Sequence, residues 1–343
     1  MFKTDSKVFE ERREIFFKKL NGKAAIIPSS SLVKHHADCE YPFRQDSNFW
    51  YLTGFDEPDS IALFLPHKPK GERFILFVAP KDILSEVWHG FRWGIEGAER
   101  EFKADKAHSI NDFEGLLPFY IGDSQEIVYS IGKHGKIEKI VLEIFSKQLD
   151  ACSRDGIGAN SIKSPEIYLN EMRLIKSAFE INRMREATQI SAEAHELVRE
   201  SISSKKNERQ IQGLIEGFFL EKGARGPAYN SIVASGDNAC ILHYTSNNSD
   251  LNNGDLLLVD AGCSLIDYYN GDITRTIPIG GKFSKEQKLL YEIVLEAQKT
   301  AIENSVKGSN SSNVHNVALR ILVEGLKEIG LLSGDTDGII ENG

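Results

Sequence analysis

The most informative part of this sequence is LLLVDAGC at residues 256–263, followed by YYNGDITRT at residues 268–276. The first segment is an apolar run typical of a strand, and the second combines turn residues with another run of strand-forming residues. If the two pair around a turn near Ile266, Asp260 and Asp272 lie opposite each other on one face, with Cβ atoms about 4.5 to 5.5 Å apart. Two carboxylates at that distance repel each other unless a cation or a proton lies between them. The pair therefore indicates half of a divalent metal site.

The same two aspartates also have a simpler interpretation. Asp272 belongs to the turn sequence Asn270-Gly271-Asp272, and Asp260 is able to cap the end of a strand. Aspartate and glycine gather in turns for reasons unrelated to function. Spacing alone leaves both interpretations open.

Two further residues near this pair are candidates for chemistry. His243 lies in the largely apolar segment 240–245, from which it can donate a hydrogen bond to a developing oxyanion. A histidine among apolar neighbours is also often a satisfied core residue. Tyr229 is most simply a packing tyrosine whose hydroxyl finds a partner, and we keep it among the candidate substrate-binding residues. The remaining histidines have no ligand spacing, so we expect them at the surface.

Length, charge and cysteine usage limit the class of protein. A chain of 343 residues favours about two domains. Its 41 basic and 50 acidic residues give a net charge of −9 without a basic stripe, which argues against nucleic acid or membrane as partner. The amino terminus lacks the apolar core of a signal peptide, and no apolar run approaches the roughly 18 residues of a membrane span. With four cysteines and no CxxC pair, we expect a reduced, cytoplasmic protein.

The changes in periodicity along the chain predict two domains joined by a linker. Residues 1–150 combine helical segments with short apolar runs, which predicts an α/β domain. The runs expected to form its strands are 24–27, 49–52, 61–65 and 74–78. Residues 151–164 lose the apolar periodicity and gain Gly, Ser and Asn, the composition of a linker.

Residues 165–343 alternate helices with strands, which predicts an α+β domain. Capping boxes at Ser177 with Glu180 and at Ser284 with Gln287 begin two of its helices. The other expected elements are strands at 231–234 and 256–259 and helices at about 207–222 and 312–329. The polar segment after residue 330 is expected to contain no further element.

Several longer motifs make the sequence resemble a known family. They are DCEYPFRQDSNFWYLTGF at 38–55, EMRLIKS at 171–177, CILHY at 240–244 and GDITRT at 271–276. In this order, and over nearly the whole chain, they are similar to bacterial Xaa-Pro aminopeptidase, also called aminopeptidase P. A series of long motifs is far more specific than a single short pattern.

The resemblance implies an α/β amino-terminal domain followed by an α+β pita-bread domain of the creatinase/aminopeptidase type. Such an enzyme releases the amino-terminal residue from peptides with proline in the second position, a bond that has no N–H for recognition. The family uses two Mn²⁺ ions bridged by a hydroxide that attacks the peptide carbonyl. Asp260 and Asp272 match two ligand aspartates, and His243 matches the histidine that stabilises the tetrahedral intermediate.

The resemblance also concerns residues of the first domain and the assembly. Asp38, Trp88 and Arg154 resemble residues that line the substrate cleft, partly across subunits, and the family suggests a homodimer or homotetramer. By their sequence context alone, Asp38 and Arg154 are equally well surface charges in loops. Trp88 is equally well a core residue.

The sequence departs from the family in two respects. The family completes its metal site with one histidine and two glutamates that have no counterpart between Asp272 and Gly343. We therefore expect the pita-bread domain to be truncated here, and residues 1–343 alone to bind manganese weakly and to hydrolyse peptides poorly. The connection from Asp260 to Asp272 is also one residue longer than is usual, which a bulge would absorb.

Two alternative functions stay open at this point. One is a non-catalytic binding or assembly homologue that has lost a complete metal site. The retention of Asp260, Asp272 and His243 together weighs against it. The other is a prolidase-like dipeptidase, which shares the second domain, although the motif at residues 38–55 favours the aminopeptidase.

Overall fold

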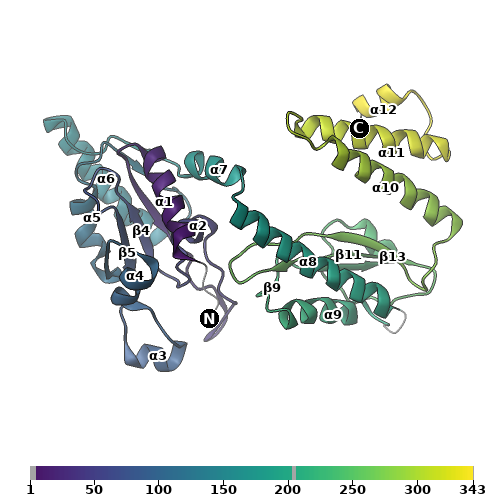
Figure 1. Cartoon of the computed structure of the whole chain (residues 1–343), viewed down its shortest axis with the longest axis horizontal. Coiled ribbons are helices and arrows are strands. Elements are labelled where there is room, and N and C mark those ends of the chain that lie inside the picture. Colours follow the sequence, from purple (N-terminus) through teal and green to yellow (C-terminus); the bar gives the residue numbers. More distant parts are fainter. Residues whose placement is uncertain (1–4, 203–205, 343) are drawn as a thin grey trace. The chain divides into compact units, whose positions relative to one another are not determined.

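The structure, a computed structural model, describes residues 5–202 and 206–342. It divides into two compact units, Met1–Asn182 and Arg183–Gly343 (Figure 1). The segment 151–164, expected to be a linker between residues 1–150 and 165–343, instead contains the end of a long helix and a strand of the first unit's sheet. Its glycines and Asn160 form the turn between these two elements, so composition alone misplaced the boundary.

Unit 1 contains a six-stranded mixed sheet with the order β6-β5-β4-β1-β7-β8. Its strands are β1 (Ala24–Pro28), β4 (Ile61–Phe64), β5 (Phe74–Val78), β6 (Lys106–Ser109), β7 (Glu126–Val128) and β8 (Ser161–Lys163). β4 pairs antiparallel with β1 and with β5, whereas the β1–β7, β7–β8 and β5–β6 pairs are parallel. A small hairpin of β2 (Lys34–His36) and β3 (Cys39–Glu40) stands apart from this sheet.

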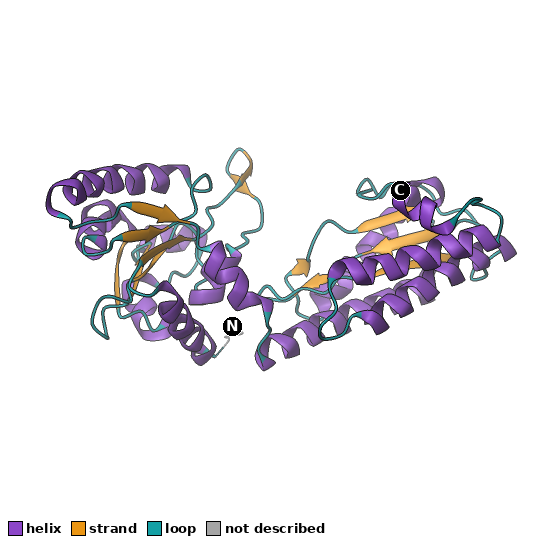
Figure 2. Ribbon diagram, turned by 90° about the horizontal axis from the view of Figure 1, so that it is seen from above, coloured by secondary structure: helices purple, strands orange, loops and turns teal. Residues whose placement is uncertain are grey.

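Helices cover both faces of this sheet (Figure 2). They are α1 (Ser6–Leu20), α2 (Ser47–Thr53), α4 (Gly94–Phe102), α5 (Phe113–Ile121), α6 (Gly135–Asp155) and α7 (Glu166–Leu174). Helix α3 (Ile83–His89) has no buried residue and belongs to neither core cluster. Successive residues of a strand point to opposite faces, and the core divides accordingly. Ile27 of β1 belongs to the cluster that contains Phe16 of α1, and Ile26 to the cluster that contains Leu117 of α5. This arrangement confirms the expected α/β domain.

The aromatic run 49–52, expected to be a strand, lies within helix α2. Asp46 caps this helix, because its carboxylate accepts hydrogen bonds from the backbone N–H groups of Asn48 and Phe49 at 2.9 and 2.8 Å. Gly54 ends the helix in the left-handed conformation, with φ of 66°. The two caps outweigh the preference of aromatic residues for strands.

Unit 2 is built on a three-stranded antiparallel sheet with the order β10-β11-β13. Its strands are β10 (Ile232–Ser235), β11 (Leu256–Asp260) and β13 (Thr274–Pro278), and β9 (Gly226–Pro227) pairs separately with β12 (Cys263–Ser264). The helices are α8 (Ala178–Ser201), which begins within unit 1, α9 (Glu208–Glu221), α10 (Lys285–Asn304), α11 (Ser311–Glu328) and α12 (Thr336–Asn342). The mixture of helices and antiparallel strands agrees with the expected α+β domain, although α12 lies in the segment expected to have no element.

The two faces of the unit 2 sheet differ. Leu257 and Val259 belong to the core cluster formed with α8 and α9. Their neighbours Leu258 and Asp260 lie on the other face because side chains alternate along a strand. A smaller cluster around Ile232, opposite Asp260 in β10, occupies that second face. Asp260 therefore projects away from the face that α8 and α9 cover.

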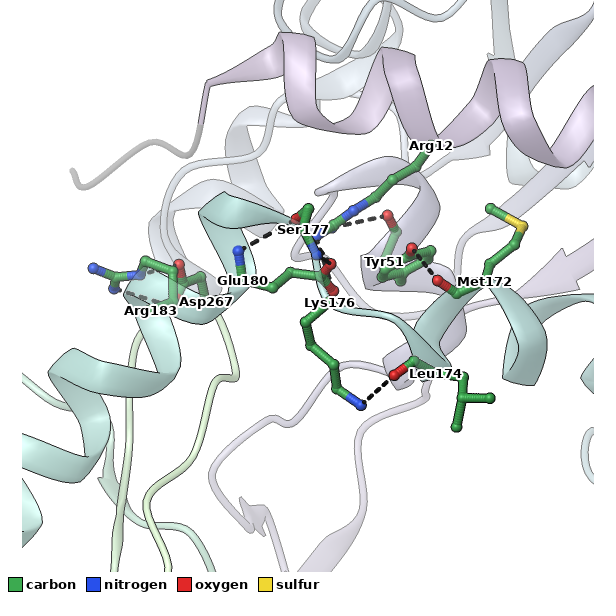
Figure 3. Close-up of polar contacts among 9 residues, drawn as sticks. All are labelled: Arg12, Tyr51, Met172, Leu174, Lys176, Ser177, Glu180, Arg183 and Asp267. Atoms are coloured by element: carbon green, nitrogen blue, oxygen red, sulfur yellow. Dashed lines mark hydrogen bonds and ion pairs between the residues drawn. The ribbon is translucent and has the colours of Figure 1, made fainter. Parts of the chain in front are cut away.

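Both expected capping boxes are present. The Ser177 N–H donates to Glu180 Oε2 at 2.9 Å, and the Glu180 N–H donates to Ser177 Oγ at 3.3 Å (Figure 3). Arg12 of α1 forms an ion pair with Glu180 Oε1 at 3.4 Å, which ties the first turn of α8 to the rest of unit 1. Ser284 and Gln287 cap α10 in the same reciprocal way. Among the described residues, no helix is long and apolar enough to cross a membrane.

Candidate metal centre

The hairpin that carries the two aspartates has a different register from the expected one. Asp260 lies opposite Thr274, not opposite Asp272. The turn is centred on Asp267 and not on Ile266, because the Leu265 N–H donates to the Tyr269 carbonyl at 2.8 Å. The shift moves the partner of Asp260 by two residues, and a shift by an even number keeps a side chain on its face. Asp260 and Asp272 are therefore diagonal neighbours on one face.

The turn at the tip of the hairpin has a well-defined form. The Tyr268 N–H donates to the Leu265 carbonyl at 3.0 Å, and Tyr268 has φ of 67°. A tight turn followed by one left-handed residue is the usual form of a three-residue hairpin loop, and it contains a bulge. β11 and β13 pair without interruption from this loop.

A single hydroxyl group joins the two carboxylates. Tyr229 Oη lies 2.5 Å from Asp260 Oδ1 and 2.9 Å from Asp272 Oδ1. A phenol has one proton, so Tyr229 can donate to only one of these oxygens at a time. Burial raises the pKa of Tyr229, and the two carboxylates raise it further, so the phenol stays protonated. Tyr229 is therefore more than a packing residue, because it brings the two aspartates to one point.

The position of Tyr229 follows from the short pairing of β9 with β12. Pro227 lies opposite Cys263, and the Ala228 N–H donates to the Gly262 carbonyl at 2.8 Å. Tyr229 is the next residue along the chain. The hairpin of the aspartates therefore also fixes the tyrosine that contacts them.

Helix α8 lies directly behind this hairpin. Ser191 Oγ accepts a hydrogen bond from the Cys263 N–H at 3.0 Å and donates one to the Ala187 carbonyl at 2.7 Å. Gly271 lies so close to α8 that an added Cβ would overlap Ser191 Oγ and the Ala187 carbonyl. A Cβ on Gly262 would likewise overlap the Gly271 carbonyl across the hairpin. Glycine at these two positions allows the close approach that places Asp272 beside Asp260.

Two polar contacts of α8 fix the segment between Asp260 and Asp272, one at its turn and one near its start. Arg183 forms a two-point ion pair with Asp267 in the turn, through Nε to Oδ2 at 2.7 Å and a second nitrogen to Oδ1 at 3.1 Å (Figure 3). His195 is 4% exposed, and its Nε2 donates to the Ala261 carbonyl at 2.9 Å. Burial lowers the pKa of His195, which favours the neutral ring. The expectation that this histidine lies at the surface was wrong.

The donor set suits a hard divalent cation. Asp260 and Asp272 offer carboxylate oxygens, the ligand type that Mg²⁺ and Mn²⁺ prefer. The described part of the chain contains no group of three or more His, Cys, Asp or Glu residues arranged to hold a metal ion. The chemistry of these two residues therefore fits a divalent metal.

His243 lies in the segment that follows the short 3₁₀ helix Gly236–Cys240. Its side chain is exposed, so it is not the core histidine that its apolar neighbours suggested. The next residue, Tyr244, is buried in the small cluster with Ile232, on the sheet face from which Asp260 projects. The segment that carries His243 therefore packs on the same side of the sheet as the aspartates.

The other three candidates belong to unit 1. Asp38 is exposed in the turn of the β2–β3 hairpin, and Arg154 is exposed in the last turn of α6. Trp88 lies on α3 and is 83% exposed, so the alternative of a core tryptophan is wrong. Their part in a substrate cleft stays a prediction.

Sequence reasoning missed the residues that support this site. His195 shares the buried stripe of α8 with Ala187 and Ser191 at four-residue spacing, a signal that was available. The close approach at Gly262 and Gly271 had only the general signal of glycines beside aspartates. The Arg183–Asp267 pair had none, because its residues are far apart in the sequence.

Comparison with known proteins agrees with this architecture. Residues 9–129 match the family described as "Aminopeptidase P, N-terminal domain", and residues 182–336 match "Metallopeptidase family M24". The chain is 41% identical to the Xaa-Pro aminopeptidase of Haemophilus influenzae over 342 residues, which is 99% of this chain and 76% of that protein. It is 35% identical to the Xaa-Pro aminopeptidase of Escherichia coli over 333 residues, which is 97% of this chain and 75% of that protein.

Solved structures give the same result. The aminopeptidase PepP of Pseudomonas aeruginosa superimposes with a TM-score of 0.93 at 35% identity, covering 100% of this chain and 77% of that one. Zn-substituted E. coli aminopeptidase P in complex with product gives a TM-score of 0.92 at 34% identity, covering 99% and 78%. The fold is thus that of a metallopeptidase with a pita-bread domain. The chain belongs to the Xaa-Pro aminopeptidase (aminopeptidase P) family.

Membership of this family settles the general activity. The protein is a metalloaminopeptidase that acts on peptides with proline in the second position and uses a divalent metal. The relatives do not favour the two alternatives, a non-catalytic homologue and a prolidase-like dipeptidase.

Proposed function

We propose that Asp260 and Asp272 hold the divalent metal of this aminopeptidase and that His243 is its catalytic histidine. The contact of the Tyr229 hydroxyl with both carboxylates is the observation that carries the proposal. Two acidic oxygens sharing one phenolic proton form a strongly negative point, which a divalent cation stabilises. The glycines and the α8 contacts support the proposal further, because they hold the aspartates in place before any metal binds.

Each residue has a distinct part in the reaction. The metal, when bound, polarises the carbonyl of the bond to be cleaved and supplies the water nucleophile at neutral pH. Asp260 and Asp272 bind the cation, and the neutral Tyr229 orients them and contacts the substrate's amino-terminal end. His243 donates a hydrogen bond to the carbonyl oxygen as negative charge develops there. Its exposed position leaves its imidazole accessible to a peptide.

We further propose two Mn²⁺ ions as the native metal. Carboxylate oxygens are typical manganese ligands, and the two aspartates provide them. A solved relative is described as Zn substituted, so the identity of the metal needs its own test.

The remaining proposals concern unit 1, the assembly and the location. Asp38, Trp88 and Arg154 are proposed to bind the substrate, which their exposure permits. Helix α3 exposes four large apolar side chains, each at least 74% exposed: Ile83, Leu84, Val87 and Trp88. A patch of this kind usually marks an interaction surface. We propose that a second copy of the chain packs against it in a homodimer or homotetramer, so that the substrate cleft at Trp88 forms partly across subunits. A cytoplasmic location stays a prediction from the sequence.

The test of the metal proposal uses binding as well as activity. Loss of a residue that only supports a metal ligand typically costs 10–100-fold, so Asp260→Asn and Asp272→Asn should each weaken Mn²⁺ binding by more than about 100-fold. Free Mn²⁺ is measured by its electron paramagnetic resonance signal in a titration of the purified enzyme. Glu303→Gln removes an exposed carboxylate from α10 and is the matched control. Unchanged Mn²⁺ binding by either aspartate variant would overturn the assignment.

The substrate range is tested with three small peptides. We expect hydrolysis of Ala-Pro-Ala, no measurable hydrolysis of Ala-Ala-Ala, and slower hydrolysis of the dipeptide Ala-Pro. Preference for the dipeptide would favour the prolidase-like alternative. Parallel assays after reconstitution with Mn²⁺, Zn²⁺ or Mg²⁺ identify the metal that supports the highest kcat.

A further inference from the structure

A buried carboxylate outside the metal centre has an unusual number of donors. Glu208 is the first residue of α9 and is 0% exposed. Its Oε1 accepts hydrogen bonds from the N–H and the hydroxyl of Ser235, both at 2.8 Å, and from Asn238 Nδ2 at 3.2 Å. Its Oε2 accepts from the Tyr244 hydroxyl at 2.8 Å and from the Ser249 N–H at 2.9 Å. Five donors therefore converge on one side chain.

The charge of Glu208 is compensated by these donors. Among the described residues, no basic side chain forms an ion pair with it. Burial acts to raise the pKa of this carboxyl, but the hydrogen bonds from Ser249, Ser235 and Tyr244 outweigh burial and leave the pKa below its usual value. The amino-terminal end of α9 also favours a negative charge at this position. Glu208 is thus a carboxylate whose charge is stabilised by hydrogen bonds.

The donors come from a single stretch of chain. Ser235 ends β10, Asn238 lies in the short 3₁₀ helix, and Tyr244 and Ser249 follow it. His243 lies inside this stretch, directly before Tyr244. A stretch without regular pairing keeps one conformation only if its polar groups find fixed partners, and Glu208 supplies these on both sides of His243.

A second buried side chain reinforces the same stretch. Asn247 is 1% exposed and adopts φ of 45°. Its Oδ1 accepts from the Val233 N–H at 2.9 Å, and its Nδ2 donates to the Ser231 carbonyl at 2.8 Å. These bonds fix the chain to β10 four residues after His243.

We infer that Glu208 and Tyr244 are positioning residues for His243, and that they hold the catalytic imidazole at a fixed place above the sheet face of the aspartates. This inference rests on the proposed role of His243. Tyr244 makes the connection, because its ring packs with Ile232 and Ala234 while its hydroxyl is bound to Glu208. A small displacement of a catalytic group can cost a large factor in rate.

The carboxylate form is required for this arrangement. A glutamine at position 208 has one acceptor oxygen, and its amide nitrogen would face the N–H of Ser249 or Ser235 as a second donor. An apolar residue would leave all five donors without a partner, which is costly in a buried place. The chain therefore keeps a buried negative charge where packing alone would not need one.

The test is a double-mutant cycle between Tyr244 and His243. Tyr244→Phe removes the hydroxyl and keeps the ring in its cluster, so the protein should fold. With an Xaa-Pro-Xaa peptide, we expect kcat to fall roughly tenfold with KM changed less than about twofold. His243→Ala alone should lower kcat by about 100-fold. In the His243→Ala background, Tyr244→Phe should cause no further loss.

Controls separate positioning from general damage. Tyr291→Phe removes a hydroxyl from α10 in the same unit and should leave kcat unchanged. Mn²⁺ binding by Tyr244→Phe should equal that of the wild type, because the aspartates do not depend on this tyrosine. Glu208→Gln should repeat the loss of kcat and its dependence on His243.

Each outcome decides the inference. An unchanged kcat in Tyr244→Phe, or an equal loss with and without His243, would overturn the positioning role and leave the proposed function intact. A wild-type kcat in His243→Ala would overturn the proposed role of the histidine, and this inference with it.

Discussion

The sheets of the two units are built from similar apolar strands but bury them differently. In unit 1, every residue of β1, β4 and β5 is buried, and helices cover both faces (Figure 2). In unit 2, the buried residues Leu257 and Val259 of β11 alternate with partly exposed ones, the last of which is Asp260. A carboxylate can be kept charged only where it reaches water, a cation or hydrogen-bond donors. The difference indicates that unit 1 uses its sheet for stability and unit 2 uses the second face of its sheet for chemistry.

The strongest test of this difference between the units is a large cavity made in the core of the unit 1 sheet. Phe64 of β4 is fully buried and stacks on Phe74 with ring centroids 5.3 Å apart. Phe64→Ala should lower the free energy of unfolding of unit 1 by about 3–5 kcal/mol. All three tryptophans lie in unit 1, so urea unfolding followed by their fluorescence reports on this unit. Phe119→Ala, at a position 69% exposed, is the control and should change it by less than about 0.5 kcal/mol.

Phe64→Ala also tests whether the metal centre of unit 2 is independent of the sheet of unit 1. Under conditions in which Phe64→Ala is fully folded, its kcat and its Mn²⁺ affinity should equal those of the wild type. A loss of Mn²⁺ affinity in the folded variant would show that the covered sheet contributes directly to the metal centre.

A smaller substitution in unit 2 should weaken metal binding as well as stability. Gly271→Ala places a Cβ against Ser191 Oγ and the Ala187 carbonyl, so the hairpin must move away from α8. We expect a stability loss of about 1–3 kcal/mol together with weaker Mn²⁺ binding, because Asp272 is the next residue. Gly217→Ala on the exposed side of α9 has free space and should stabilise the protein by about 0.5–1 kcal/mol. Unchanged Mn²⁺ binding in Gly271→Ala would show that the close approach to α8 is not needed for the site.

The pH dependence of unit 2 should depend on Glu208. Its pKa in the folded protein lies below the usual value, so it contributes stability above the unfolded-state pKa of about 4.3. This contribution is lost as the pH falls through the folded-state pKa. The wild type should therefore exceed Glu208→Gln in stability at pH 7, and the difference should shrink below about pH 4. Thermal unfolding of both proteins from pH 3 to pH 8 measures it, and a constant difference would contradict the shifted pKa.

The smallest effect on stability is expected at the exposed helix of unit 1. Val87 is 77% exposed, so Val87→Asp should change the free energy of unfolding by less than about 0.5 kcal/mol. If a second copy covers α3, the buried charge should instead lower the molar mass measured by light scattering. Val306→Asp, at a position 63% exposed in unit 2, should leave the mass unchanged. An equal mass for both variants would place the interface elsewhere.

Much of the fold was predictable because its signals are local. Capping boxes at Ser177 and Ser284 begin α8 and α10 as expected, and the apolar runs of β1, β4 and β5 form strands. The prediction of a strand at 49–52 was wrong because the helix caps at Asp46 and Gly54 outweigh the strand preference of the residues between them. The segment 151–164 was expected to be a linker because a turn between two elements of one unit has the same composition as a linker.

The candidate site was predictable in part. The spacing of Asp260 and Asp272 correctly predicted a common face, although the register differs by two residues. His195 could have been placed by its four-residue spacing from Ala187 and Ser191 on α8. Glu208 was not predictable as a buried group, because a polar side chain is buried only where distant parts of the chain supply its partners. Those partners come from segments whose positions the local sequence does not reveal.

The tight contact at Gly262 has a consequence for how this protein can vary. Every codon one nucleotide away from a glycine codon, other than those for glycine itself and stop, specifies a residue with a Cβ. Each such residue would collide with the Gly271 carbonyl across the hairpin. Random mutagenesis should therefore recover almost no active protein altered at position 262, while the exposed Gly217 tolerates change. A position that binds nothing should thus be as intolerant of mutation as the aspartates it places.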